Sequence, residues 1–153
     1  MNTGKVDITV ETMAAVELLG AVRMALNRGD TDSAVDQFSD QFKFNDQALE
    51  LEFTDKAGLT EFFEKARELF PDCLVLTDTI FTSGDHLISE WTLQATVTEA
   101  LFPQGPLKRP ITLHGVSVLR IKNGKIINWS DYYDGLKARR NALAAFFTEW
   151  VEL

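Results

Sequence analysis

The hydrophobic periodicity of the chain changes near Pro71 from a helical pattern to the alternation that is typical of strands. Before Pro71, apolar residues recur at helical spacing, most regularly from Leu59 to Phe70. After it, long segments of mixed apolar and polar residues follow one another, separated by short turns. Helices first and strands second predict an α+β fold, in which a strongly curved antiparallel sheet wraps over helices and leaves a cavity.

Three helices are expected in the N-terminal half. The first has a line of apolar residues at helical spacing, formed by Leu18, Leu19, Val22, Ala25 and Leu26. Gly29 stops it, and Asp32 is placed to cap a short second helix. The third helix carries the stripe from Leu59 to Phe70, and Thr54 or Asp55 is placed to cap it.

The strand signals begin with a hairpin, 42–46 with 49–53, and continue after the third helix. Four longer strands are expected, at Leu74–Thr82, His86–Thr98, Ile111–Ile121 and Lys125–Asp134. Asn123-Gly124 favours a two-residue hairpin turn between the last two, because both positions tolerate a positive φ. Phe102–Pro110 is proline-rich and predicts a loop, and Arg139–Leu153 predicts a closing helix.

Length and charge narrow the class of protein. At 153 residues the chain is expected to form a single domain over residues 1–153. The net charge of −8 disfavours nucleic-acid and membrane-surface partners, because it repels phosphate groups. Cys73 is the single cysteine and excludes an intrachain disulfide, and Met1–Val10 lacks the pattern of a signal peptide. No apolar stretch is long enough to span a membrane, so cytoplasm is the expected compartment.

Asp131 is the most informative polar residue, since it lies near the end of an otherwise apolar strand. Strand alternation places it on one face with Ile127, Trp129 and Tyr133. A carboxylate among aromatic rings is desolvated, which raises its pKa and suits it to proton transfer near neutral pH. The alternative is an exposed aspartate that caps the loop after the strand.

Other candidates have stronger structural alternatives. Asp46 shares strand parity with Phe44 but directly precedes a turn, so turn capping explains it equally. His114 lies in mid-strand, where a lone histidine is more often structural than catalytic. Glu90 has the opposite parity to Trp91, which favours a surface or dimer-contact role. With two histidines and one cysteine, no usual zinc-ligand spacing exists, and no metal site is expected.

Several motifs between Leu59 and Asp134 resemble one known group of proteins. They are Phe62-Phe63, Phe70-Pro71-Asp72, Gly84-Asp85 before the Trp91 strand, and Arg120 through Asn123-Gly124-Lys125-Ile126 to Trp129 and Tyr133-Asp134. This pattern resembles the SnoaL-like polyketide cyclases and the ketosteroid-isomerase-like group, within the nuclear-transport-factor-2-like (NTF2-like) superfamily. The resemblance implies a cone built from three N-terminal helices, a strongly curved sheet and a C-terminal helix. It does not imply one reaction, because this fold hosts many functions.

Three members of that superfamily imply roles for individual residues. The segment from Ala25 to Asp46 is similar to the start of ketosteroid isomerases, and Asp46 falls on their general base. Their two acidic hydrogen-bond donors correspond to Val22 and Ser117 here. The 129–134 segment resembles the last strand of limonene-epoxide hydrolases, whose arginine and second aspartate correspond to Trp91 and Leu93. SnoaL cyclases imply a late acidic residue, Asp131 or Asp134, and a histidine for which His114 is the substitute.

Together these features predict a cofactor-independent acid–base enzyme for a small apolar carbonyl or polyketide-like substrate. Asp131 is expected to be the principal catalytic residue, with Asp46 as second carboxylate. The expected pocket residues are Phe44, Trp91, Leu93, His114, Ser117, Trp129 and Tyr133. The alternative from another class is a non-catalytic small-ligand-binding or dimerisation module of the same fold. The strands that carry Glu90 and Arg120 have outward faces of mixed polar and apolar residues, and the resemblance implies a homodimer through this surface, because relatives of the fold commonly pair there.

Overall fold

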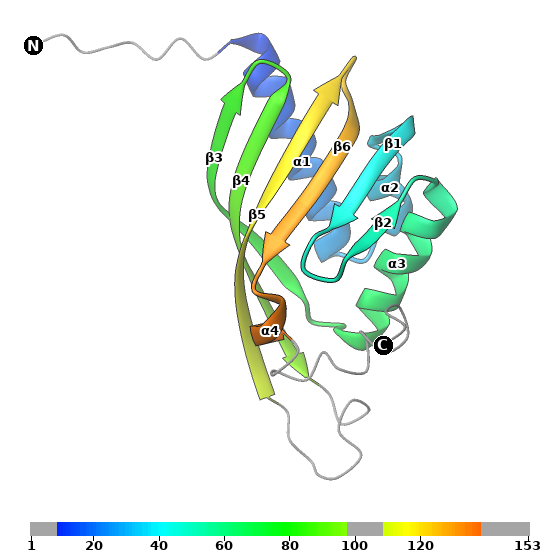
Figure 1. Ribbon diagram of the computed structural model, residues 1–153, viewed down its shortest axis with the longest axis vertical. Coiled ribbons are helices and arrows are strands. Elements are labelled where there is room, and N and C mark those ends of the chain that lie inside the picture. Colours follow the sequence, from blue (N-terminus) through cyan, green and yellow to red (C-terminus); the bar gives the residue numbers. More distant parts are fainter. Residues whose placement is uncertain (1–8, 98–108, 139–153) are drawn as a thin grey trace, which may run out of the picture.

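The computed structural model describes residues 9–97 and 109–138. The helices are α1 (Val10–Asn27), α2 (Thr31–Val35), α3 (Lys56–Leu69) and α4 (Gly135–Ala138). The strands are β1 (Phe38–Asp46), β2 (Leu51–Phe53), β3 (Leu74–Ser83), β4 (His86–Val97), β5 (Arg109–Lys122) and β6 (Lys125–Tyr133). Figure 1 shows α1 and α2 behind a tall sheet, with β3 and β2 at its two edges.

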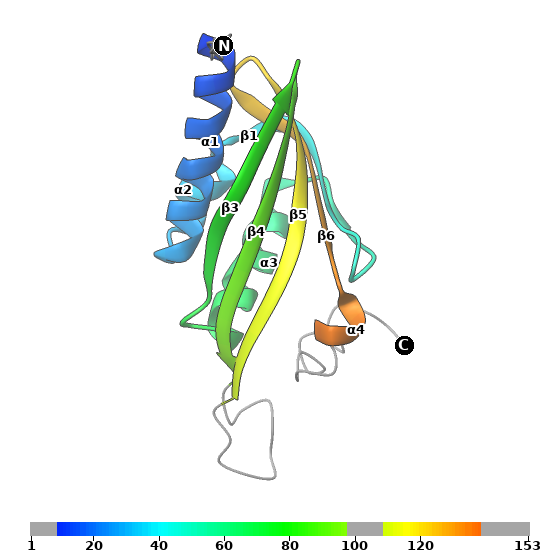
Figure 2. The same ribbon diagram turned by 90° about the vertical axis from the view of Figure 1, so that its left-hand side faces the viewer.

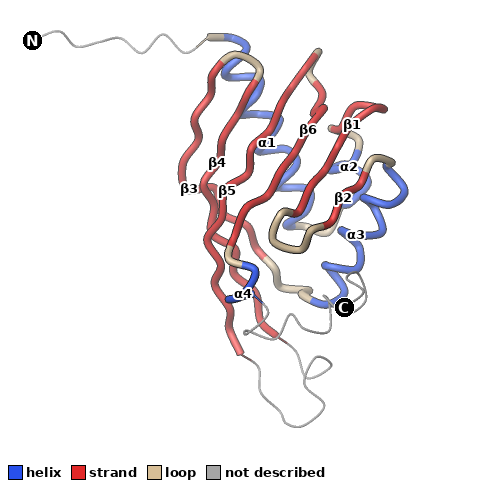
Figure 3. The backbone as a smooth tube through the Cα atoms, viewed as in Figure 1, coloured by secondary structure: helices blue, strands red, loops and turns tan. Residues whose placement is uncertain are grey.

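The six strands form one sheet in the order β2-β1-β6-β5-β4-β3. All neighbours are antiparallel except β1 and β6, which run in the same direction. The expectation of a wholly antiparallel sheet is therefore wrong at this one pair. No hairpin joins β1 to β6, because β2, α3, β3, β4 and β5 lie between them in the sequence. Figure 3 shows the curved path of the strands, and register shifts in three of the strand pairs mark bulges that bend them.

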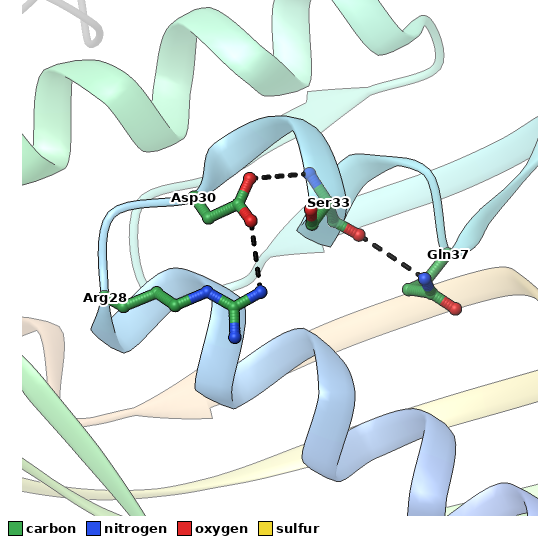
Figure 4. A network of polar contacts seen from close by, with 4 residues as sticks. All are labelled: Arg28, Asp30, Ser33 and Gln37. Carbon is green, nitrogen blue, oxygen red and sulfur yellow. Dashed lines mark hydrogen bonds and ion pairs between the residues drawn. The ribbon is translucent and has the colours of Figure 1, made fainter.

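The three predicted N-terminal helices are present, and their caps are defined. Asp55 caps α3 through a 2.7 Å hydrogen bond from Gly58 N, as one of the two predicted candidates. The cap of α2 is Asp30, not the predicted Asp32, because the helix begins at Thr31. Asp30 accepts from Ser33 N and from the Arg28 guanidinium, so one carboxylate joins the end of α1 to the start of α2 (Figure 4).

An aromatic cluster joins α3 to the sheet. Phe62 and Phe63 of α3 pack against Phe44 of β1, with ring centroids 5.9 and 5.5 Å apart. Phe44 also stacks on Trp129 of β6 at 6.1 Å. Such ring pairs add favourable geometry to the burial of large apolar surfaces. The predicted stripe on α3 is therefore the face that packs against β1, and Phe44 connects this face to Trp129 of β6.

Helices α1, α2 and α3 lie on one side of strands β3–β6, and α4 lies at the end of β6 (Figure 2). Along β4, alternation buries Leu87, Ser89 and Trp91 on the helix side and exposes Ile88 and Glu90 on the outer side. Glu90 is thus exposed, as its parity predicted. Among the described helices, none is long and apolar enough to span a membrane.

Strand β5 begins two residues earlier than the sequence predicted. Arg109 and Pro110 belong to β5, where Pro110 is the register partner of Thr96, so the predicted loop ends two residues earlier than expected. The rest of that loop and the predicted helix Arg139–Leu153 lie outside the described residues.

Candidate functional site

A cavity of about 230 Å³ lies between the inner face of the sheet and helices α1 and α3. Its walls are mainly apolar and include Phe44, Leu49, Phe62, Trp91, Leu93 and Trp129. The polar side chains that reach it include Arg23, Asp46, Ser117, Asp131 and Tyr133. An apolar cavity with a few convergent polar groups is the usual form of a small-molecule site.

Asp131 is held in a defined orientation at this cavity. Its Oδ1 accepts a 2.5 Å hydrogen bond from Ser117 Oγ and a 2.7 Å bond from Trp129 Nε1. Within residues 9–97 and 109–138, no donor is bonded to its Oδ2. One oxygen therefore fixes the carboxylate, and the other retains its lone pairs for a ligand.

The environment of Asp131 favours its protonated form. Burial raises the pKa of this carboxyl group, and the hydrogen bonds from Ser117 and Trp129 and the charge of Arg23 oppose that rise only in part. The predicted direction of the pKa change is confirmed.

Asp46 lies beside Asp131, because the parallel pairing of β1 and β6 makes the two aspartates register partners. Its Oδ2 accepts a 2.8 Å hydrogen bond from Tyr133 Oη, and its Oδ1 accepts from Leu49 N at 3.0 Å. Asp46 thus caps the turn, as the structural alternative proposed, and also lines the cavity. Burial and then the nearby charge of Asp131 raise its pKa to about 7, against the hydrogen bond from Tyr133.

The indole ring of Trp91 can extend across β5 because the residue opposite it on that strand has no side chain. Its register partner is Gly115, and the indole Nε1 donates to Ser117 Oγ at 2.9 Å. A Cβ at Gly115 would overlap the indole ring. Gly115 therefore lets Trp91 reach the hydroxyl that also orients Asp131.

We expect Gly115→Ala to destabilise the protein by about 1–3 kcal/mol, as overpacked substitutions do. Thermal or chemical unfolding measures this loss. The matched control is Gly20→Ala on α1, where a Cβ meets nothing within 4 Å and removal of a helical glycine is expected to add up to about 1 kcal/mol. Equal effects from the two substitutions would contradict the packing described for Trp91.

Two predicted candidates lie away from the cavity. The side chain of His114 lies on the outer face of the sheet, where its Nδ1 is 3.0 Å from Thr92 Oγ1. Its placement in the pocket was wrong, because alternation directs the neighbouring Leu113 inward and His114 outward. Asp134 is exposed and accepts from Lys137 N, so it caps α4, and Asp131 is the late acidic residue of the cavity among the described residues.

Arg23 is a cavity residue that sequence reasoning missed. It is 6% exposed, and it donates from α1 to Thr77 Oγ1 at 2.6 Å, Ser89 Oγ at 2.8 Å and Ser117 Oγ at 3.4 Å. The signal was present: Arg23 stands at i+4 from Leu19, in the stripe that α1 buries. A charged residue at a core position of a helix is the feature that would have identified it.

Other chemistries find little support among the described residues. No group of three His, Cys, Asp or Glu side chains there could hold a metal ion. Cys73 lines the cavity, and burial raises the pKa of its thiol to about 11, so the thiol is protonated at neutral pH. The carboxylates among the described residues that line the cavity are those of Asp46 and Asp131.

Known proteins share this architecture. The NTF2-like fold is shown by solved structures of low sequence identity. IdmH from Streptomyces antibioticus, a candidate polyketide cyclase, is 15% identical with a TM-score of 0.73, over 82% of this chain and 96% of its own. A ketosteroid-isomerase-like protein from Catenulispora acidiphila, in complex with trimethylamine, is 17% identical with a TM-score of 0.70, over 84% and 90%. TerC, co-crystallised with polyporic acid, is 14% identical with a TM-score of 0.71, over 86% and 98%.

No curated protein matches the chain in sequence. A family-level comparison is more informative, since residues 16–142 match the family described as SnoaL-like polyketide cyclase. That match includes α2, α3, all six strands, α4 and most of α1. It covers well over half of the 153 residues, and the protein therefore belongs to the SnoaL-like polyketide cyclase family.

Proposed function

We propose that the protein is a cofactor-independent acid–base enzyme that moves a proton on a small, apolar carbonyl or polyketide-like substrate. The observation that carries this proposal is the geometry of Asp131, whose Oδ1 is fixed by Ser117 and Trp129 while Oδ2 is left for a ligand. A base that is already oriented, beside an apolar wall, is suited to remove a proton from carbon next to a carbonyl group.

The proposed step balances without a further reagent. Ionised Asp131 takes the proton, the C–H electron pair moves into the carbonyl group, and an enolate and a neutral Asp131 carboxylic acid result. Return of the proton from Asp131 to another carbon gives an isomer. Alternatively, attack of the enolate carbon on a second carbonyl forms the C–C bond that closes a ring, and the resulting alkoxide takes the proton from Asp131. No electrons leave the substrate, so the step needs no redox cofactor.

Asp46 is the proposed second carboxylate. With a pKa of about 7 it is partly protonated at neutral pH, and Tyr133 fixes one of its oxygens. A neutral Asp46 avoids placing two negative charges on neighbouring strands, and it keeps a proton near the reacting atoms. Phe44, Trp91, Leu93, Trp129 and Tyr133 would form the walls around the substrate.

The names of related proteins support a ligand of this class. IdmH is described as a candidate cyclase of polyketides, and TerC was crystallised with polyporic acid. The second candidate function is a non-catalytic module that binds a small apolar ligand. The position of His114 favours it, because the residue expected to replace the family's histidine lies on the outer face of the sheet.

Proton exchange distinguishes the two candidates without knowledge of the natural substrate. 2-Tetralone is a bicyclic ketone with acidic protons beside its carbonyl group, and NMR in D₂O follows their replacement by deuterium. An enzyme with a poised base accelerates the exchange above the buffer rate. If 2-tetralone binds but exchanges at the buffer rate, the non-catalytic module is the better account.

We further propose that the protein forms a homodimer through the outer face of its sheet, which carries Ile88 and Glu90. Large apolar side chains are exposed there, including Leu76 at 42%, Ile88 at 40% and Tyr132 at 48%. We expect light scattering at micromolar concentration to give twice the chain mass of 17.2 kDa, with an interface on the order of 1,600 Å². Ile88→Asp should shift the mass to that of the monomer, and a monomeric wild type would contradict this assembly.

A further inference from the structure

Arg23 is a buried cation whose described partners are all neutral. Its hydrogen bonds go to the hydroxyl groups of Thr77, Ser89 and Ser117. None of the ion pairs found in the described part of the chain involves its guanidinium. A buried charge is costly unless it is paired, so this arrangement calls for a nearby negative charge.

That charge is supplied through one bridging hydroxyl. Ser117 Oγ accepts from Arg23 Nη2 at 3.4 Å and donates to Asp131 Oδ1 at 2.5 Å. Asp131 therefore helps to balance Arg23 while it is ionised, without touching it, and Asp78 of β3 is a second negative charge that acts on Arg23. Burial lowers the pKa of Arg23 to about 10, which still leaves the guanidinium charged at neutral pH.

When Asp131 removes a proton from the substrate, Asp131 becomes neutral. The balance with Arg23 is then lost unless the negative charge that forms on the substrate stays close. Once Asp131 is protonated, its charge has moved to the substrate oxygen. Among the described residues that line the cavity, the Lys and Arg side chains are those of Arg23 and Arg67. Arg67 is engaged elsewhere, since its Nη1 donates to the Asn27 carbonyl oxygen at 2.9 Å. A guanidinium has five N–H donors, more than the three bonds to hydroxyl groups use.

We propose that Arg23 binds the substrate oxygen on which negative charge develops, and that the cavity thereby selects compounds that carry an enolisable carbonyl or an acidic phenol beside an apolar ring system. The proposal rests on the proposed acid–base function and adds to it the group that stabilises the product of proton removal. Donors placed where charge develops contribute more to catalysis than donors that meet a neutral ground state.

The test measures binding of an anion and needs no turnover. Asp131→Asn reproduces the uncharged state of Asp131, and 4-nitrophenol reports its own ionisation by visible absorbance. We expect 4-nitrophenol bound to Asp131→Asn to ionise at a lower pH than it does in water. Adding Arg23→Gln should weaken nitrophenolate binding roughly 10- to 100-fold, the usual range for loss of a charged hydrogen bond.

Two controls separate the loss of the Arg23 charge from a general change in the shape of the cavity. Arg28→Gln removes an exposed arginine, paired with Asp30 at 3.1 Å outside the cavity (Figure 4), and should leave nitrophenolate binding unchanged. Nitrobenzene, which has no acidic oxygen, should bind equally well with and without Arg23. A loss of affinity for both probes would assign Arg23 to the shape of the cavity and overturn the proposal.

Thermal unfolding checks that Arg23→Gln still folds. If it does not, Arg23→Lys keeps a cation and should retain part of the change in nitrophenol ionisation. The proposal is overturned if bound nitrophenol ionises at the same or a higher pH than in water, or if the double variant binds it as tightly as Asp131→Asn. Because binding is read in a variant that lacks the base, these outcomes are independent of whether the wild type catalyses exchange of 2-tetralone.

Discussion

Asp131→Asn is expected to slow exchange of the 2-tetralone protons by about 10²–10⁴-fold, the usual contribution of a positioned acid or base. The reason is that an amide cannot accept the substrate proton, whereas the shape of the side chain is retained. The Asn carbonyl oxygen can still accept from Ser117 and Trp129, the two donors that fix Oδ1 of the aspartate. Binding of nitrobenzene should therefore be unchanged.

A matched control is Asp134→Asn, three residues further along, because Asp134 is exposed and caps α4. This variant should exchange 2-tetralone at the wild-type rate. Asp131→Asn should also be as stable as the wild type above neutral pH, or more stable, since burial disfavours the ionised carboxylate. A large loss of stability would instead make Asp131 a structural partner of the last strand and favour the non-catalytic module.

The free energy of unfolding of the wild type is expected to fall as the pH rises from about 4 to about 7, and Asp46 contributes to this fall. Its pKa in the folded protein is about 7, against an ordinary value of 3.8. The folded state thus holds the proton more tightly than the unfolded state does, and this stabilisation is complete below pH 3.8 and lost as the pH rises through 7. The difference corresponds to at most about 4 kcal/mol.

Urea unfolding of the wild type and Asp46→Asn at several pH values measures this effect. The stability of Asp46→Asn should decrease clearly less over the same pH range. Part of the decrease should remain, because the pKa of Asp131 is also raised. Asp40→Asn is the control, since Asp40 is fully exposed on the same strand and should leave the pH dependence unchanged. The same decrease in Asp46→Asn as in the wild type would show that Asp46 is not the group that titrates.

Local patterns predicted most of the architecture because they depend on neighbours in the sequence. The stripe of α3, the Asn123-Gly124 turn and the alternation of β6 each determine one element or one face. The position of β1 does not follow from such patterns. Its parallel pairing with β6 joins strands far apart in the chain, and only that pairing shows that Asp46 and Asp131 are neighbours.

The part of the site that lies on a single strand could be predicted from the sequence. The part where different elements come together could not. Trp129, Asp131 and Tyr133 share a face of β6, so their common position at the cavity followed from alternation. Arg23 reaches the same place from α1, and the register of a helix against a sheet cannot be read from either segment alone. His114 was misplaced because the family analogy was given more weight than the parity of its own strand.

The central claim is that the Asp131 carboxylate is the base, and its titration tests this most directly. ¹³C NMR of protein labelled at the aspartate carboxyl carbons, with Asp131→Asn for assignment, gives the pH at which Asp131 ionises. The rate of 2-tetralone exchange is measured over the same pH series. We expect Asp131 to ionise above pH 3.8 and the exchange rate to rise with that same midpoint. An Asp131 that ionises at or below pH 3.8, or an exchange rate that rises with a different midpoint, would contradict the assignment of Asp131 as the base.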